Sequence, residues 1–172
     1  MTLSFHTAAT QTFLTMLKGL QQVLKVAEAN AQARKIDPQV LLNSRLAPDM
    51  FPLIRQVQIV TDNAKGAVHR LAGRDIPAFE DNETSFAELQ ARLERTIELV
   101  QSIPAQDIDG HESRQVTMRR PSGDMVFSAK DYLLGFAVPN FMFHVVTAYN
   151  ILRHNGVPLA KDEFFGRERS AA

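Results

Sequence analysis

The C-terminal quarter of the chain constrains the fold most, because it predicts one long helix that is apolar over most of its circumference. Ser128 and Asp131 have the spacing of a helix N-cap and its third helical residue. The residues after them recur three and four positions apart and line one face: Leu133, Phe136, Ala137, Asn140, Phe143, His144, Thr147, Ala148 and Ile151. Phe141, Val145 and Leu152 widen that face. Such a helix is typical of the centre of a helical bundle.

Three earlier segments predict the other long helices. Apolar residues recur at helical spacing in residues 4–34, 52–71 and 86–100. A short helical turn follows Asp37-Pro38, since proline is tolerated at the first helical position. Gly19 weakens the first helix and is typical of a close crossing by another helix.

Polar residues at the helix ends predict where helices begin and stop. Gly73 is expected to end the second long helix, and Ser85 to Glu88 form a capping box at the start of the third. Asp49 is expected to cap the second helix with its carboxylate. The polar face of the third helix is expected to be a solvated, ion-paired surface without a binding role; it carries Glu88, Arg92, Glu94, Arg95 and Glu98.

The period of the sequence changes between Pro104 and Ser128. Two segments, RQVTMRR and DMVFSA, alternate apolar and polar residues, and the turn-forming run 121–124 separates them. This pattern predicts a short two-stranded hairpin that packs on the bundle. The sequence therefore predicts an all-α four-helix bundle with a β-hairpin inserted before the last helix, as a single domain over residues 1–172.

Composition excludes several classes of function. Lysine plus arginine equals aspartate plus glutamate at 19 each, and no basic run is present, so a nucleic-acid interface is not expected. The absence of cysteine excludes disulfides, zinc–thiolate sites and a cysteine nucleophile. No apolar run approaches the ~20 residues of a membrane span, and the N-terminus has no signal-peptide pattern, so a cytoplasmic protein without membrane contact is expected. Zero net charge favours self-association.

Four polar residues of the second and fourth long helices are candidate ligand-binding residues: His144, Asn140, Arg55 and Gln58. His144 lies on an apolar face, where a histidine bonds a neighbour such as Asn140 or Thr147, lines a pocket, or ligates a metal. Arg55 needs a carboxylate partner if it is buried, and it is equally suited to an anionic ligand.

Four stretches resemble a known family: LAPDMFPLIRQVQ (46–58), RLAG (70–73), FAELQARL (86–93) and DYLLGFAVPNFMFHVVTAYNILRHNGV (131–157). They are similar to an uncharacterised bacterial domain-of-unknown-function family of the DinB/YfiT-like superfamily, over essentially the whole chain. The resemblance implies a DinB-like four-helix bundle that is commonly dimeric. Many members of the superfamily carry a divalent metal on three histidines, one from the second helix and a His-x-x-x-His pair from the fourth. Better understood relatives include thiol-dependent transferases and isomerases.

This sequence matches that histidine pattern at one position. His144 corresponds to the first histidine of the pair, but Ala148 stands one turn later, and His69 lies far along the second helix. We therefore expect no metal and no other cofactor. The alternative is a zinc, nickel or manganese site in which Asp49, Asp62 or Gln58 replaces the missing histidines.

Three functions stay open from the sequence, and whether the protein is an enzyme stays open with them. The first is a metal-free bundle protein that binds a small ligand between the second and fourth helices near His144. The second is a divalent-metal-dependent enzyme of the thiol transferase or hydrolase type. The third is a structural or regulatory homodimer. The apolar tail residues Leu159, Phe164 and Phe165 are expected to fold back on the bundle or to cross to a second subunit.

Overall fold

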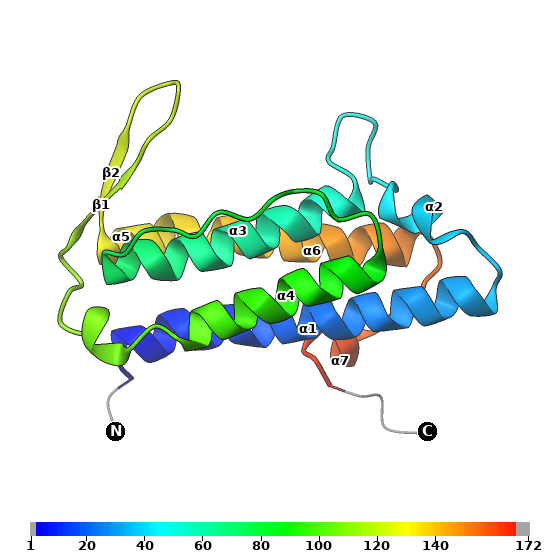
Figure 1. Cartoon of the computed structure of the whole chain (residues 1–172), viewed down its shortest axis with the longest axis horizontal. Helices are drawn as coiled ribbons and strands as arrows, with labels where there is room; N and C mark the ends of the chain where they lie inside the picture. Colours follow the sequence, from blue (N-terminus) through cyan, green and yellow to red (C-terminus); the bar gives the residue numbers. More distant parts are fainter. Residues whose placement is uncertain (1–2, 168–172) are drawn as a thin grey trace.

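The computed structural model describes residues 3–167, and its main element is a bundle of four long helices (Figure 1). They are α1 (Phe5–Ala33), α3 (Leu53–Ala72), α4 (Phe86–Gln101) and α6 (Val138–His154). Each packs on two others, in the ring α1–α4–α3–α6, around one hydrophobic core. The short helix α2 (Pro38–Leu42) and the single turn η1 (Ala105–Asp107) lie in the connections. The predicted all-α bundle is confirmed.

The helix ends follow from local polar residues, as the sequence predicts. Ser128 accepts a hydrogen bond from the backbone N–H of Asp131 at 3.1 Å, and Ser85 accepts one from that of Glu88 at 3.2 Å. Gly73 ends α3 in the left-handed conformation at φ 68°. The expected cap on α3 is wrong: its N-cap is Pro52, which has no side-chain donor or acceptor, and Asp49 lies in the turn before it.

The predicted hairpin is present and projects from one end of the bundle (Figure 1). Its strands β1 (Gln115–Met118) and β2 (Met125–Ser128) are antiparallel, with Gln115 opposite Ser128. Its base packs on the following short helix α5 (Ala129–Tyr132), and Val116 points into the core. The far end of the hairpin is exposed. The predicted packing of the hairpin on the bundle is therefore correct for its base only.

The C-terminal tail folds back on its own bundle. Helix α7 (Lys161–Phe164) packs across α1, and the carbonyl oxygen of Phe164 occupies the place where a side chain at Gly19 would begin. The ring of Phe164 packs edge-on against Tyr149, with the ring centroids 5.5 Å apart. The close crossing predicted at Gly19 is therefore made by α7. Leu159 and Phe164 fold back on the bundle, which is the first of the two alternatives left open for the tail, whereas Phe165 is 40% exposed.

The C-terminal helix differs from its prediction in one respect. Helix α5, the π-helical turn η2 (Leu133–Ala137) and α6 run on without a break and together form the long helix that we call the C-terminal helix, although the short α7 follows it in the chain. This helix is not surrounded by other elements. One side packs on α3 and α1, while Leu134, Phe143 and Val146 on the other side are 59%, 57% and 39% exposed. A helix in a four-membered ring has two close neighbours, so its outer side stays open whatever residues it carries.

The same helix is the one element among residues 3–167 whose length and composition would allow it to cross a membrane. In its most apolar window, 39% of the residues are buried within the bundle. This is weak evidence for a span, because the core helix of a soluble protein passes the same test.

Candidate functional site

His144 of α6 bonds across the bundle to α3. Its Nδ1 lies 2.7 Å from Oε1 of Gln56, a side chain that is only 1% exposed. The partners expected within its own helix are wrong, since Thr147 donates instead to the carbonyl oxygen of Phe143. The sequence signal for Gln56 was its place in the buried stripe of α3, between Leu53 and Val57.

The hydrogen bonds of Gln56 fix the tautomer of His144. The Gln56 amide nitrogen donates to the carbonyl oxygen of Phe51 at 3.0 Å, so the amide oxygen is the atom that faces the imidazole ring. An amide oxygen only accepts, and Nδ1 must therefore carry the proton. The lone pair is then on Nε2, for which the part of the chain described here supplies no hydrogen-bond partner.

The surroundings of His144 favour its neutral form. Partial burial lowers its pKa below the ordinary value of 6.5, and the positive charge of nearby Arg55 lowers that pKa further. A neutral imidazole with an open lone pair can accept a hydrogen bond from a ligand or take a proton from it.

Arg55 and Gln58 lie on α3 in a chain of polar contacts. Arg55 forms an ion pair with Asp81 and donates to Oε1 of Gln58 at 3.2 Å. Gln58 in turn donates to Glu83 at 2.9 Å. Of the two roles left open for Arg55, the structure shows the carboxylate partner, although the side chain remains 37% exposed. Asn140 lies one turn before His144 on α6 and is half-buried, and its side chain has no hydrogen bond or ion pair within residues 3–167.

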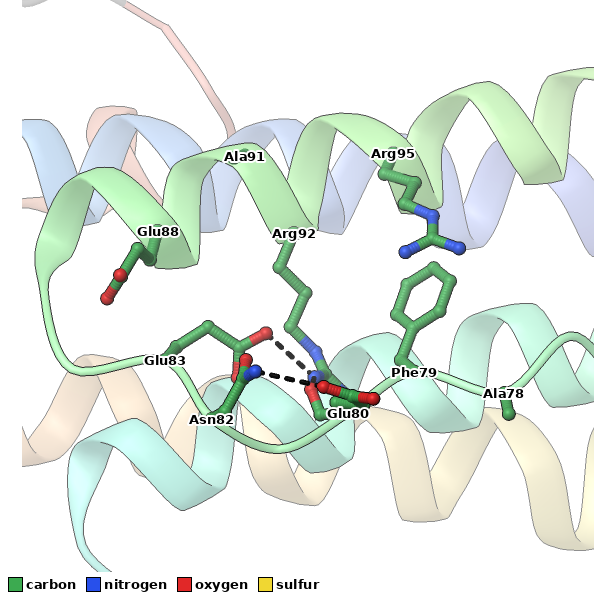
Figure 2. Close-up of a pocket in the computed structure, with 9 residues that line it drawn as sticks. All are labelled: Ala78, Phe79, Glu80, Asn82, Glu83, Glu88, Ala91, Arg92 and Arg95. Atoms are coloured by element: carbon green, nitrogen blue, oxygen red, sulfur yellow. Dashed lines mark hydrogen bonds and ion pairs between the residues drawn. The ribbon is translucent and has the colours of Figure 1, made fainter.

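Arg92 of α4 is buried, so the prediction that it lies on a solvated face is wrong. It is 4% exposed, and every nitrogen of its guanidinium group has a partner at 2.6 to 3.0 Å. Figure 2 shows its side chain reaching from α4 toward the loop that precedes this helix. The acceptors are the Thr61 hydroxyl, the Glu80 carbonyl and the carboxylates of Asp62, Asp81 and Glu83.

The spacing of Arg92 gave a signal for its burial. It lies three residues after Leu89 and four before Thr96, both buried, so it shares the core-facing side of α4. The loop 74–85 carries four acidic residues, and two of them, Asp81 and Glu83, supply carboxylates to the buried arginine. The ring of Phe79 in the same loop lies 4.1 Å from the guanidinium of Arg95 and 4.2 Å from Nζ of Lys65.

An open groove of about 550 Å³ lies between this loop and α4 (Figure 2). Its lining is mostly polar and charged: Ala78, Phe79, Glu80, Asn82, Glu83, Glu88, Ala91, Arg92 and Arg95. It is not the pocket expected between the second and fourth long helices beside His144. Glu83 lines the groove and also accepts from Gln58, so the groove is connected by hydrogen bonds to Gln58 and, through it, to Arg55.

The residues around His144 do not fit the three-histidine metal centre of the superfamily. Within residues 3–167, no three side chains of the histidine, cysteine, aspartate and glutamate types lie close enough together to hold a metal ion. His69 is turned into its own helix, where its Nδ1 contacts the Lys65 carbonyl oxygen at 2.7 Å. Asp62 is paired with Lys65 and Arg92, and the charged group that acts on His144 is the cation Arg55.

Comparison with known proteins agrees with the fold. A domain of unknown function, DUF1993, matches residues 5–165. A crystal structure of a DinB family member protein from Shewanella denitrificans is similar, with a TM-score of 0.84 and 38% sequence identity over 95% of this chain and 92% of that chain. No curated protein matches the chain.

Proposed function

The chain belongs to the DUF1993 family and has a DinB-like fold, and on that basis we propose that it binds a small anionic molecule between α3 and α6, at His144 and Arg55. The hydrogen bond from His144 to Gln56 carries the proposal. It holds the imidazole in one tautomer and orientation, with Nε2 as an open acceptor.

The ligand that suits these groups is a small carboxylic acid with a hydroxyl or amide N–H donor. The planar guanidinium group of Arg55 matches a carboxylate, and the donor would bond to Nε2 of His144. Arg55 is paired with Asp81, but an ion pair that is about one third exposed contributes little, about 0–1 kcal/mol, so a ligand carboxylate can replace Asp81. Asn140 and Gln58 border this place on the two helices and would add amide contacts.

The test is a thermal-shift and NMR screen of small hydroxy- and amino-carboxylic acids. A ligand should raise the melting temperature of the wild type by mass action, shift the imidazole signals of His144, and lose at least tenfold in affinity in Arg55→Met and His144→Phe. Arg95→Met is the matched control, because Arg95 lies in the groove of α4 and should leave binding unchanged.

Three outcomes would contradict the proposal. Binding that survives both variants would place the ligand elsewhere, and binding lost only in Arg95→Met would move it to the groove. Stoichiometric zinc, nickel or manganese in protein purified without a metal-affinity tag, absent from His144→Phe, would favour the metal-dependent enzyme instead.

A structural or regulatory homodimer is the second candidate function. The exposed apolar side chains of the C-terminal helix support it, since contiguous exposed apolar residues are typical of protein interfaces.

A further inference from the structure

The exposed side of the C-terminal helix carries an apolar stripe, and we propose that a second copy of this chain packs on it in the antiparallel direction. We define the outer stripe as Leu134, Pro139, Phe143 and Val146. The inference deepens the second candidate function, the homodimer, and rests on it; it does not depend on ligand binding at His144.

The outer stripe is continuous because of the π-helical turn. Pro139, Phe143 and Val146 follow at four and three residues, the spacing of one face of an α-helix. Leu134 is five residues before Pro139, and the wider turn η2 lies between them. All four residues are exposed, so the turn leaves Leu134 on the open side of the helix with the others. The other large exposed apolar residues lie on different elements, such as Val40 on α2 and Val126 on β2.

The charges at the two ends of the outer stripe are self-complementary in the antiparallel arrangement. Asp131 lies 11 residues before Met142 and Arg153 lies 11 residues after it, and both are exposed. A two-fold axis near Met142 and Phe143 therefore places Asp131 opposite Arg153 of the partner subunit, twice in the dimer. A parallel pair would place like charges together. Lys130 points about a quarter turn away from Asp131 around the helix, so it does not face the same position.

The proposed dimer also borders His144. The Phe143 ring packs edge-on against the imidazole with the centroids 5.2 Å apart. A second copy that packs on Phe143 would therefore change the surroundings of His144. The NMR signals of the His144 imidazole would report on the interface even when no ligand is bound.

Light scattering after size-exclusion chromatography tests the interface. The wild type should have about twice the 19.2 kDa mass of one chain, and Phe143→Glu combined with Val146→Glu should have one chain mass. Val126→Glu is the matched control, since Val126 is 54% exposed on the hairpin and should leave the dimer intact. Circular dichroism checks that each variant keeps its helices.

A charge-swap cycle tests the antiparallel direction. Asp131→Arg and Arg153→Asp should each weaken the dimer about tenfold or more, and the double variant should restore it. Single variants that leave the dimer unchanged would overturn the direction.

Cross-linking gives a readout that does not require the dimer to dissociate. The chain has no cysteine, so Phe143→Cys introduces one thiol near the proposed axis. Mild oxidation should join two copies at this position and leave Val126→Cys unjoined. Three results would overturn the proposal. The wild type could be monomeric, or the variant with Phe143→Glu and Val146→Glu could remain a dimer. The wild type could also be a monomer that co-floats with anionic vesicles, which would assign the outer stripe to a membrane surface.

Discussion

At the scale of single residues, the orientation of His144 depends on the side-chain amide of Gln56, whose own orientation is set by a second hydrogen bond. Gln56 is buried, donates to the Phe51 carbonyl and accepts from the imidazole, so one glutamine determines which ring nitrogen is open. The sequence predicted His144 as the candidate but not Gln56 as its partner. Periodicity predicts which side of a helix is buried. A hydrogen bond between two helices depends in addition on their relative position along the helix axes, which periodicity does not give.

The lowered pKa of His144 predicts a pH dependence of stability. The unfolded chain binds more protons than the folded chain between the folded pKa and the ordinary value of 6.5, so this contribution is complete above pH 6.5 and is lost as the pH falls through the folded pKa. Urea unfolding between pH 8 and pH 5 should show the wild type losing stability relative to His144→Gln. Gln56→Glu places a carboxylate against Nδ1 and should reverse the trend. Parallel curves for the wild type and His144→Gln would contradict this account.

At the scale of elements, the helix bounds were predictable and the packing was not. Ser85, Ser128 and Gly73 act on backbone groups within a few residues, and their effects are present in the sequence. By contrast, the exposed side of α6 carries apolar residues as its buried side does, so the sequence predicted a helix that is surrounded by other elements on all sides. Gly19 was predictable in part: the sequence predicted a close crossing at this residue but did not identify α7 as the element that crosses there.

Replacing Gly19 with alanine should destabilise the protein by about 1–3 kcal/mol. The new methyl group would meet the Phe164 carbonyl, which is backbone and cannot rotate away, so α7 must shift. Urea unfolding measures the loss. Gly135→Ala is the control, because nothing lies within 4 Å of its added carbon and alanine favours a helix by about 0.5–1 kcal/mol. Equal stability of Gly19→Ala and the wild type would show that α7 does not pack as described.

At the scale of the whole molecule, Arg92 joins its own helix α4 to two other segments, α3 and the loop that connects α3 to α4. Its guanidinium group contacts α3 through Thr61 and Asp62, and the loop before α4 through Asp81 and Glu83. The sequence predicted a solvated position for this residue, because charged residues on a helix usually face solvent. Its burial depends on acids that the loop brings back over α4, and that arrangement exists only in the folded chain.

Arg92→Met should therefore cost about 3 kcal/mol in the free energy of unfolding, because it leaves the largely buried carboxylate of Glu83 without its cation and removes one of the two cations paired with Asp62 and with Asp81. Arg95→Met, three residues later and exposed, should cost less than about 1 kcal/mol, since it loses only its contact with Phe79. Urea unfolding and proteolysis within residues 74–85 measure both effects. A variant at Arg92 as stable as the one at Arg95 would show that the network does not hold the loop.

The π-helical turn gives the C-terminal helix a property that a regular helix lacks. Removing one residue from Leu133–Ala137 would leave an ordinary α-helix in which Leu134 and Pro139 are four residues apart, so the segments on either side would keep nearly the same orientation around the helix axis. Leu134 would stay in line with Phe143, and the hairpin would keep its place at the end of the bundle. The turn therefore accommodates one extra residue without rotating the two ends of the molecule relative to one another, whereas a deletion within the regular part of α6 would rotate them by about 100°.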